Sequence, residues 1–393
     1  MIAERISRIS PSATLQMTAK AAELRNSGID VVNLSVGEPD FPTPKHIRDA
    51  ATFAIENGVT KYTPGHGTIE LRKAITKKLS RDNNLNYKHQ NIIVSCGGKH
   101  SLYNACQALF QKNDEVIIFT PYWVSFPDFV SITGAKPIFV KTNPDKQFEP
   151  QFDDLIKKIS KNTKAIIINS PSNPTGGVWS DESIKQVLEI ANHNDLWIFS
   201  DECYEQLTYD KPFKSIATYD DKSNKILTFQ SCSKTYAMTG WRIGYMAGDI
   251  NVVQAMSKLQ GQSTSCPNSI AQYAAIEALT GDQTQIKNMK NIFKLRRDYI
   301  VSELNNINGI TCNKPKGAFY VFPDFSYYIQ LNNEISNSFD LSMYFLKTIN
   351  LVTVAGGAFG ADNYIRFSYA ASDDDLKKAI KLLKVSLSKL NGE

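Results

Sequence analysis

A lysine with hydroxyl and guanidinium neighbours is the clearest chemical feature of the sequence. Lys234 lies between Ser233 and Thr235, Ser231 stands three residues before it, and Arg242 follows eight residues after it. An amine in this setting can condense with an aldehyde, while the hydroxyls and the guanidinium can bind a phosphate on the same molecule. A single lysine after a strand is also common in ordinary solvated loops, so this interpretation needs support from other residues.

A pair of glycines could complete the phosphate site. The run Gly97-Gly98-Lys99 follows an apolar strand pattern and opens a helical one, which leaves backbone N–H groups to point at an anion. Turns of this kind often join a strand to a helix without binding a ligand. In combination with the hydroxyls and the arginine near Lys234, the turn predicts one phosphate-binding site.

The stretch 231–245 closely resembles the lysine segment of the class I pyridoxal-phosphate-dependent aminotransferases, in particular the bacterial and archaeal type of aspartate aminotransferase. The resemblance covers nearly the whole chain, from residues 35–41 to residues 366–370. It implies the fold type I architecture of pyridoxal-phosphate enzymes, with pyridoxal 5'-phosphate as cofactor. It further implies that Lys234 holds the cofactor as an aldimine and then moves the proton at the substrate α-carbon.

Four further residues match positions that hold the cofactor ring in this family. Carbanion chemistry at an amino acid needs an electron sink, and a pyridine ring serves as one only while a carboxylate keeps its nitrogen protonated. The resemblance assigns this carboxylate to Asp201, which lies 33 residues before Lys234. It assigns the contacts to the ring oxygen to Tyr204 and Asn173, and the stack over the ring to Trp123. Ordinary alternatives are a helix cap for Asp201, a plain turn for Asn173 and a core position for Trp123.

Two cations predict a site for a dicarboxylic substrate. Arg366 interrupts an apolar strand pattern, where a buried guanidinium needs a partner, either the substrate α-carboxylate or a structural salt bridge. The resemblance implies that Lys99 binds the side-chain carboxylate of aspartate or glutamate. It also places Gly37, Trp123 and Asn173 against the substrate.

The resemblance therefore predicts transamination between aspartate and 2-oxoglutarate, which gives oxaloacetate and glutamate by a ping-pong route. The partners are then small amino acids and 2-oxo acids. Three alternatives stay open: a preference for aromatic, prephenate or alanine substrates, a lyase on the same fold, and a ligand-binding regulator built on an inactive aminotransferase fold. Ser10 weakens the prephenate alternative, because relatives that accept prephenate tend to carry a basic residue there.

Tyr62 matches the tyrosine with which this family reaches the cofactor phosphate of the neighbouring subunit. The resemblance therefore implies a homodimer. No spacing in the sequence shows this independently.

Apolar runs that alternate with helical patterns predict how these residues are brought together. Seven strands are expected at 91–96, 115–119, 136–140, 164–169, 196–200, 225–230 and 242–247, with helices such as 100–111 and 181–194 between them. Ser180 is the expected cap of the second of these helices. The order is typical of an α/β fold in which a mostly parallel seven-stranded sheet lies between helices. Asp201 and Lys234 then follow strand ends, where ligands collect in parallel sheets.

The segments after this sheet predict a second, smaller unit. Helical patterns at 283–306, 339–350 and 372–390 alternate with short apolar runs at 318–322, 351–354 and 364–369. We expect a large cofactor-binding domain over residues 45–285 and a small α+β domain over residues 286–393. The resemblance joins the amino-terminal segment, residues 1–44, to the small domain.

Composition and charge argue against several other classes of protein. Of the 393 residues, 42% are hydrophobic and 21% are charged, as in soluble globular enzymes. No stretch approaches the roughly 20 apolar residues needed to span a bilayer, so we expect a cytoplasmic protein without a membrane partner. The formal net charge of +5 is spread along the chain with no basic block, which argues against binding to nucleic acid.

The cysteines offer one further alternative. The six of them contain no Cys-x-x-Cys pair, which argues against a metal site and against a disulfide framework. Cys96, Cys203 and Cys232 lie beside expected site residues, so a catalytic thiol must be weighed. A small buried side chain is the more ordinary role for a cysteine.

Overall fold

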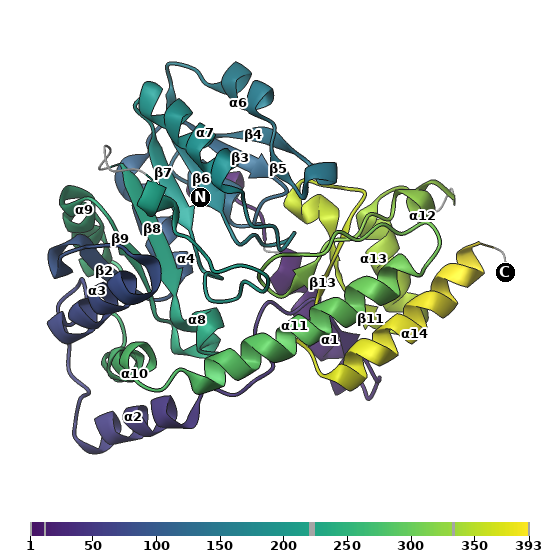
Figure 1. The fold of residues 1–393 in the computed structure, drawn as a ribbon, viewed down its shortest axis with the longest axis horizontal. Coiled ribbons are helices and arrows are strands. Elements are labelled where there is room, and N and C mark those ends of the chain that lie inside the picture. Colours follow the sequence, from purple (N-terminus) through teal and green to yellow (C-terminus); the bar gives the residue numbers. More distant parts are fainter. Residues whose placement is uncertain (1, 12, 220–224, 332–334, 392–393) are drawn as a thin grey trace.

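The chain folds into a large sheet covered by helices, with a smaller group of helices and short strands beside it (Figure 1). The computed structural model describes residues 2–11, 13–219, 225–331 and 335–391. In Figure 1 the central strands of the large sheet are teal, and the smaller group is built mainly from the green and yellow carboxyl-terminal part. Each part has a hydrophobic core of its own.

The large sheet has eight strands in the order β2-β9-β8-β7-β6-β3-β4-β5. They are β2 (Ile92–Ser95), β3 (Glu115–Thr120), β4 (Lys136–Asn143), β5 (Glu149–Pro150), β6 (Thr163–Asn169), β7 (Trp197–Asp201), β8 (Ile226–Ser231) and β9 (Gly244–Ala247). Strands β4, β3, β6, β7 and β8 pair in parallel, whereas β9 is antiparallel to both of its neighbours and β5 is antiparallel to β4. The predicted α/β class is confirmed. The predicted count of seven strands is one too few, because β5 has only two residues and no apolar pattern of its own.

Alternate residues of the central strands pack on opposite faces of the sheet. Val116 and Ile118 of β3 belong to the core that α4 (Gly98–Leu109), α5 (Phe126–Ser131) and α9 (Ile250–Gly261) cover. Ile117 and Phe119 belong to the core under α7 (Asp181–His193). Strands that are buried on both faces read as continuous apolar runs, as these do. Helices on both faces therefore fix the strand ends on which the site is built.

This part has five further helices in the described residues. They are α2 (Lys45–Glu56), α3 (Ile69–Asn83), α6 (Phe152–Lys158), α8 (Cys232–Thr235) and α10 (Ser269–Thr280). Single 3-10 turns occur at Glu4–Arg8, His89–Asn91, Pro144–Lys146, Ile216–Tyr219, Thr239–Trp241 and Gly356–Phe359. Ser180 caps α7 as predicted, because its Oγ accepts a hydrogen bond from the N–H of Ser183 at 3.2 Å.

The smaller part is built on a three-stranded antiparallel sheet, β10-β13-β12, and on a parallel pair of β1 and β11. Its elements are α1 (Ala13–Asn26), β1 (Val32–Asn33), α11 (Thr284–Asn305), β10 (Tyr320–Val321), α12 (Ser326–Leu331), α13 (Ser338–Ile349), β11 (Leu351–Val352), β12 (Val354–Ala355), β13 (Ile365–Ser368) and α14 (Asp373–Leu390).

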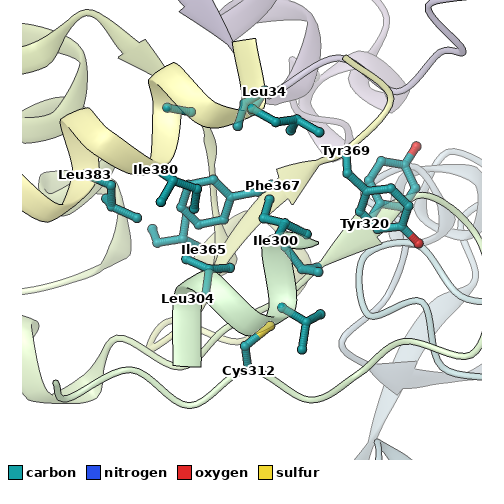
Figure 2. Close-up of a cluster of buried hydrophobic side chains, with 14 of the residues drawn as sticks. Leu34, Ile300, Leu304, Cys312, Tyr320, Ile365, Phe367, Tyr369, Ile380 and Leu383 are labelled. Atoms are coloured by element: carbon teal, nitrogen blue, oxygen red, sulfur yellow. The ribbon is translucent and has the colours of Figure 1, made fainter. Parts of the chain in front are cut away.

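The core of the smaller part draws on both ends of the chain. Ile300 and Leu304 of α11 belong to one buried cluster with Phe367 of β13 (Figure 2). Leu383 of α14 and Leu34 of the amino-terminal segment belong to the same cluster. The amino-terminal segment thus contributes to the core of the carboxyl-terminal part. The precise domain boundaries at 1–44, 45–285 and 286–393 stay a prediction.

Two classes of feature are missing from the described residues. None of their helices is both long and apolar enough to cross a membrane. In the same ranges, no three histidine, cysteine, aspartate or glutamate side chains gather in a way that could hold a metal ion.

Candidate active site

A cleft of about 570 Å³ opens where three neighbouring parallel strands end. Asn169, Asp201 and Ser231 are the last residues of β6, β7 and β8, and all three line it. The smaller part closes the cleft from the other side with Tyr320 and Arg366. This is the edge of a parallel sheet at which ligands are expected, because the loops after the strands diverge there.

The cleft gathers every predicted site residue except Gly97 and Tyr62. The predicted residues that line it are Gly37, Gly98, Lys99, Trp123, Asn173, Asp201, Tyr204, Ser231, Ser233, Lys234, Arg242 and Arg366. Gly97 lies at its border, where a Cβ atom on this residue would be 2.2 Å from Nη2 of Arg242. Tyr62 lies elsewhere, with 90% of its surface exposed.

The glycine turn and the lysine segment lie against each other. Gly97 has a φ of +92°, and α4 begins at the next residue, so the first N–H groups of that helix face the cleft border. A Cβ on Gly244 would be 2.1 Å from the backbone nitrogen of Gly98, which leaves no room for a side chain there. On the facing segment, Oγ of Ser231 contacts Oγ of Ser233 at 2.9 Å. Backbone donors and hydroxyls thus meet in one corner, as an anion site requires.

Arg242 enters this corner from a strained backbone position. Its φ is +55°, and its Nη1 donates to the backbone oxygen of Thr239 at 2.6 Å. The predicted strand at 242–247 therefore begins too early. The 3-10 turn Thr239–Trp241 ends in the left-handed conformation of Arg242, so strand pairing starts only at Gly244.

Lys234 lies on the one-turn helix α8, which directly follows β8. Its Nζ donates to the backbone oxygen of Gly37, so the amino-terminal segment reaches the lysine. Withdrawal from water lowers the pKa of Lys234, and the positive charges of Arg242 and Arg366 act in the same direction. A lowered pKa raises the share of the neutral amine, which is the form that attacks carbonyl carbons and accepts protons.

Asp201 is a buried acid whose carboxylate has few interactions that stabilise its negative charge. It is 6% exposed, and the described structure gives its carboxylate one hydrogen bond, from the N–H of Cys203 at 3.2 Å. Burial raises the pKa of Asp201 to about 7. A cationic N–H group in the cleft would stabilise the ionised form of this acid and lower its pKa. The helix-cap alternative for Asp201 is wrong, since no helix begins beside it.

Tyr204 meets a residue that the sequence did not single out. Its hydroxyl lies 2.8 Å from the hydroxyl of Tyr320, and burial raises the pKa of Tyr204 well above its usual value. The ring of Tyr320 also lies 4.5 Å below the guanidinium of Arg366, and its hydroxyl would be 2.9 Å from a Cβ on Gly37. Tyr320 sits in a short apolar strand with no motif around it, so only the three-dimensional structure reveals its place.

Arg366 has no acidic partner among the described residues. It is 1% exposed, and its Nη1 and Nη2 donate to Oδ1 of Asn173 at 2.8 Å and to the backbone oxygen of Ser35 at 2.6 Å. Its Nε is buried without a hydrogen-bond partner. The alternative of a structural salt bridge is therefore unsupported. A guanidinium with neutral partners and one unused donor has capacity for a carboxylate from a ligand.

Lys99 and Trp123 form the second cationic corner. Nζ of Lys99 lies 5.0 Å from the centre of the Trp123 ring. Burial lowers the pKa of Lys99, and the charge of Arg242 lowers it further. Trp123 packs edge-on against Phe126 and Phe129 with ring centres 5.3 and 5.8 Å apart, which fixes the plane of its ring at the cleft wall.

The thiols next to the site are poor nucleophiles. Burial raises the pKa values of Cys203 and Cys232 to about 12. A thiol attacks as the thiolate, which is scarce at neutral pH for both residues. The catalytic-thiol alternative therefore has no support at Cys203 or Cys232.

Comparison with known proteins identifies the family. The sequence model of the family "Aminotransferase class I and II" matches residues 29–383. The aspartate aminotransferase of Bacillus subtilis is 43% identical, and a probable aspartate/prephenate aminotransferase of Aquifex aeolicus is 41% identical. The alignment with the Bacillus subtilis enzyme covers 98% of each chain, and the alignment with the Aquifex aeolicus protein covers 99% of each chain. The solved aspartate aminotransferase of Thermus thermophilus with maleate matches with a TM-score of 0.93 at 37% identity, over 98% of this chain and 99% of that one. The chain therefore belongs to the class I and II aminotransferases, and it is an enzyme of their fold type I that depends on pyridoxal 5'-phosphate.

Proposed function

We propose that this aminotransferase transfers the amino group of aspartate to 2-oxoglutarate and so gives oxaloacetate and glutamate in two half-reactions. The observation that carries the proposal is that Arg366 and Lys99 line the same cleft, in addition to Lys234 and Arg242, whose roles the cofactor accounts for. Arg366 has only neutral partners among the described residues, and Lys99 lies beside Trp123 at the start of α4. A dicarboxylic amino acid offers one carboxylate to each cation. The relatives from Bacillus subtilis and Thermus thermophilus carry names that agree with this substrate.

The residues of the cleft suit the cofactor ring. When bound, pyridoxal 5'-phosphate withdraws electrons from the substrate α-carbon, provided that its ring nitrogen is protonated. Asp201 would face that nitrogen, because it is a buried acid without a cationic hydrogen-bond partner in the described structure. Tyr204 and Asn173 would donate to the ring oxygen, and Trp123 would cover one face of the ring. These roles account for residues that otherwise have little reason to share a cleft.

The phosphate would bind where the glycine turn meets the lysine segment. The N–H groups of Gly98 and Lys99 at the start of α4, the hydroxyls of Ser231 and Ser233, and the guanidinium of Arg242 provide its donors. Gly97 supports this site by leaving space for Arg242, since a side chain at that position would displace the guanidinium.

Lys234 would tether the cofactor and move the proton. The Nζ atom would take the proton from the α-carbon of the amino acid and pass it to the bound cofactor, and the second half-reaction would run this transfer in reverse. Its lowered pKa supports this role, because the neutral amine is the form that accepts a proton. Arg366 and Lys99 would hold the substrate by both carboxylates, which limits the movement of its α-carbon relative to Nζ.

A homodimer would complete the site. Tyr62 is not among the described residues that line the cleft of its own chain, and its exposed side chain is available to the cleft of a second copy. Phe53 and Tyr273, which belong to α2 and α10, stack at 5.8 Å and are also exposed, so these two helices present apolar surface that a second copy could cover. The cytoplasmic location stays a prediction from the sequence.

A single-turnover experiment tests the proposed substrate. Purified enzyme is mixed with aspartate, glutamate, alanine or phenylalanine, and the absorbance of the cofactor is followed through the first half-reaction alone. We expect aspartate and glutamate to give the highest second-order rate constants for this half-reaction. A higher value for alanine or phenylalanine would contradict the proposed substrate while leaving the family assignment intact.

A further inference from the structure

A cluster of buried charged and polar side chains lies directly behind the residues that would face the cofactor. Lys78 of α3 and Gln230 of β8 are each 2% exposed. Glu202 and Glu205, which follow β7, are 0% and 6% exposed. Gln230 lines the cleft and precedes Ser231, and Glu202 is the chain neighbour of Asp201. The cluster therefore touches the site, although the transamination chemistry proposed above makes no use of it.

The ammonium group of Lys78 is fully engaged. Its Nζ donates to Oδ1 of Asn83 at 2.8 Å, to Oε1 of Gln230 at 2.7 Å and to Oε1 of Glu205. An ammonium has three N–H donors and no acceptor. All three donors are therefore used, and every partner must present an oxygen to Lys78.

Lys78 fixes the orientation of the Gln230 amide. Oε1 of Gln230 accepts from Lys78 and also from the hydroxyl of Tyr245 at 2.8 Å. Its Nε2 then donates to Oε2 of Glu202 at 3.2 Å. The reversed amide would place an NH₂ group against an ammonium, so it is excluded while Lys78 carries its charge. Because Lys78 donates to Oε1 of Gln230, the Nε2 end of the amide is the end that donates to Glu202.

Both carboxylate oxygens of Glu202 accept hydrogen bonds. Its carboxylate accepts from Oγ of Ser200 at 2.8 Å, Oγ of Ser215 at 2.7 Å and the N–H of Ile216 at 3.1 Å, in addition to Nε2 of Gln230. Burial raises the pKa of Glu202, and the donors from Ser215, Ser200 and Gln230 oppose that rise. Four donors directed at two oxygens match an ionised carboxylate, because the protonated acid would have to donate one bond itself.

We propose that Lys78 and Gln230 are positioning residues that hold Glu202 as a second negative charge beside Asp201, and that this charge strengthens the preference of the site for a cationic ring nitrogen. Glu202 does not face the ligand itself. Its charge acts on Asp201 through the low-dielectric interior, where like charges favour uptake of a cation between or beside them. This inference rests on the proposed placement of the ring nitrogen at Asp201.

The experiment compares two ligands that differ at one ring atom. Cofactor is removed from the full-length protein, and dissociation constants are measured for pyridoxal 5'-phosphate and for its 1-deaza analogue, in which carbon replaces the ring nitrogen. Glu202→Gln should raise the dissociation constant of pyridoxal 5'-phosphate by about tenfold, which corresponds to about 1.4 kcal/mol. The dissociation constant of the analogue should stay within about twofold, because the analogue brings no ring cation. A purely structural role of Glu202 would raise both constants together.

Two further variants separate the effect of the Glu202 charge from a general loss of structure. Glu205→Gln makes the same chemical change three residues along the chain. It takes the anion away from Lys78 but leaves an oxygen at that position for Lys78 to bond and leaves Glu202 in place, so any selective loss should be smaller than in Glu202→Gln. Lys78→Met combined with Glu205→Gln removes the ammonium without stranding a buried carboxylate. It should reproduce the selective loss seen in Glu202→Gln. If Glu202→Gln does not fold, this double variant decides by the same criterion.

Asp201→Asn shows which part of the argument fails. If Asp201→Asn weakens both ligands equally, the proposed placement of the ring nitrogen is wrong. If Asp201→Asn weakens only pyridoxal 5'-phosphate while Glu202→Gln changes neither constant or changes both alike, the role of Lys78, Gln230 and Glu202 is wrong. A selective loss in Glu205→Gln as large as in Glu202→Gln would also overturn it.

Discussion

Nη1 of Arg366 donates a hydrogen bond to Oδ1 of Asn173 at 2.8 Å, and this contact joins the smaller part of the chain to the turn after β6. Because the amide oxygen of Asn173 accepts this bond, its NH₂ group is left to donate elsewhere. One interaction therefore orients both a residue proposed to bind the substrate and a residue proposed to contact the cofactor ring.

Arg366→Lys should weaken every amino acid substrate. Lysine keeps the charge but cannot present the planar pair of donors that grips a carboxylate, and it loses at least one of the contacts to Asn173 and Ser35. We expect kcat/KM to fall by about two decades, or about 3 kcal/mol, for dicarboxylic and neutral amino acids alike. Steady-state kinetics with both kinds of substrate check this, and a loss confined to one kind would contradict it.

Lys234→Ala should abolish turnover while the protein stays folded. The variant lacks both the covalent tether and the base, so kcat should fall by several orders of magnitude. Wild-type protein should purify yellow and keep its cofactor through gel filtration, whereas the variant should release it. Near wild-type turnover in Lys234→Ala would show that another group takes the proton.

The stability of the cofactor-free protein should depend on pH through Asp201. Burial raises the pKa of Asp201 from 3.8 to about 7, and the charge of Glu202 adds to this rise while Lys234 opposes it. The folded protein therefore keeps this proton at pH values where the unfolded chain has lost it. The contribution to stability is fully present below about pH 4 and is lost as the pH rises through about 7. From the shift, we expect a loss of about 4 kcal/mol in the free energy of unfolding over this window.

Asp201→Asn provides the matched control for this pH dependence, since asparagine does not titrate. Urea unfolding of both cofactor-free proteins at pH 5 and at pH 8 gives the comparison. The wild type should lose clearly more stability between the two pH values than the variant does. Equal losses would show that Asp201 ionises normally in the folded protein.

Hybrid dimers should show whether Tyr62 acts in the neighbouring subunit. Tyr62→Ala and Lys234→Ala proteins, each of low activity, are unfolded together and refolded as a mixture. A hybrid dimer contains one site with an intact Lys234 and an intact Tyr62 only if Tyr62 reaches across to the other chain. Activity well above the sum of the parents is the expected result, whereas simple additivity would place Tyr62 in its own subunit or outside the site.

The sequence predicts those parts of the site that are built from local segments. Lys234 and its hydroxyls lie together on one turn, and the glycines at 97 and 98 lie on another, so their chemistry can be read from neighbouring residues. The alternation of apolar runs also predicts that these turns follow strand ends, and the cleft at the ends of β6, β7 and β8 confirms this. Family resemblance then supplies Asp201, Asn173 and Arg366, which lie in the same cleft although they are far apart in the chain.

Tertiary packing decides the parts that the sequence does not predict. Tyr320 reaches Tyr204 across 116 residues, and Lys78 reaches Gln230 across 152. Neither Tyr320 nor Lys78 has a local motif, because a short strand and a helix face are enough to place them. The start of β9 is missed for a related reason, since the left-handed backbone of Arg242 follows from its contacts with the turn at Thr239 and Cys96 rather than from its residue type.

Lys99→Ala tests the central claim most directly, because Lys99 is the residue that distinguishes a dicarboxylic substrate from other amino acids. The variant loses a charge-assisted contact worth roughly 1.5–3 kcal/mol, or about one to two decades in kcat/KM. The measurement is kcat/KM for aspartate, glutamate, alanine and phenylalanine in the wild type, in Lys99→Ala and in Lys99→Arg as the charge-preserving control. The values for aspartate and glutamate should fall in Lys99→Ala, those for alanine and phenylalanine should stay flat or rise, and Lys99→Arg should retain most of the preference. Equal losses for all four substrates in Lys99→Ala would contradict the account, because Lys99 would then serve the cofactor phosphate or the fold rather than the second carboxylate.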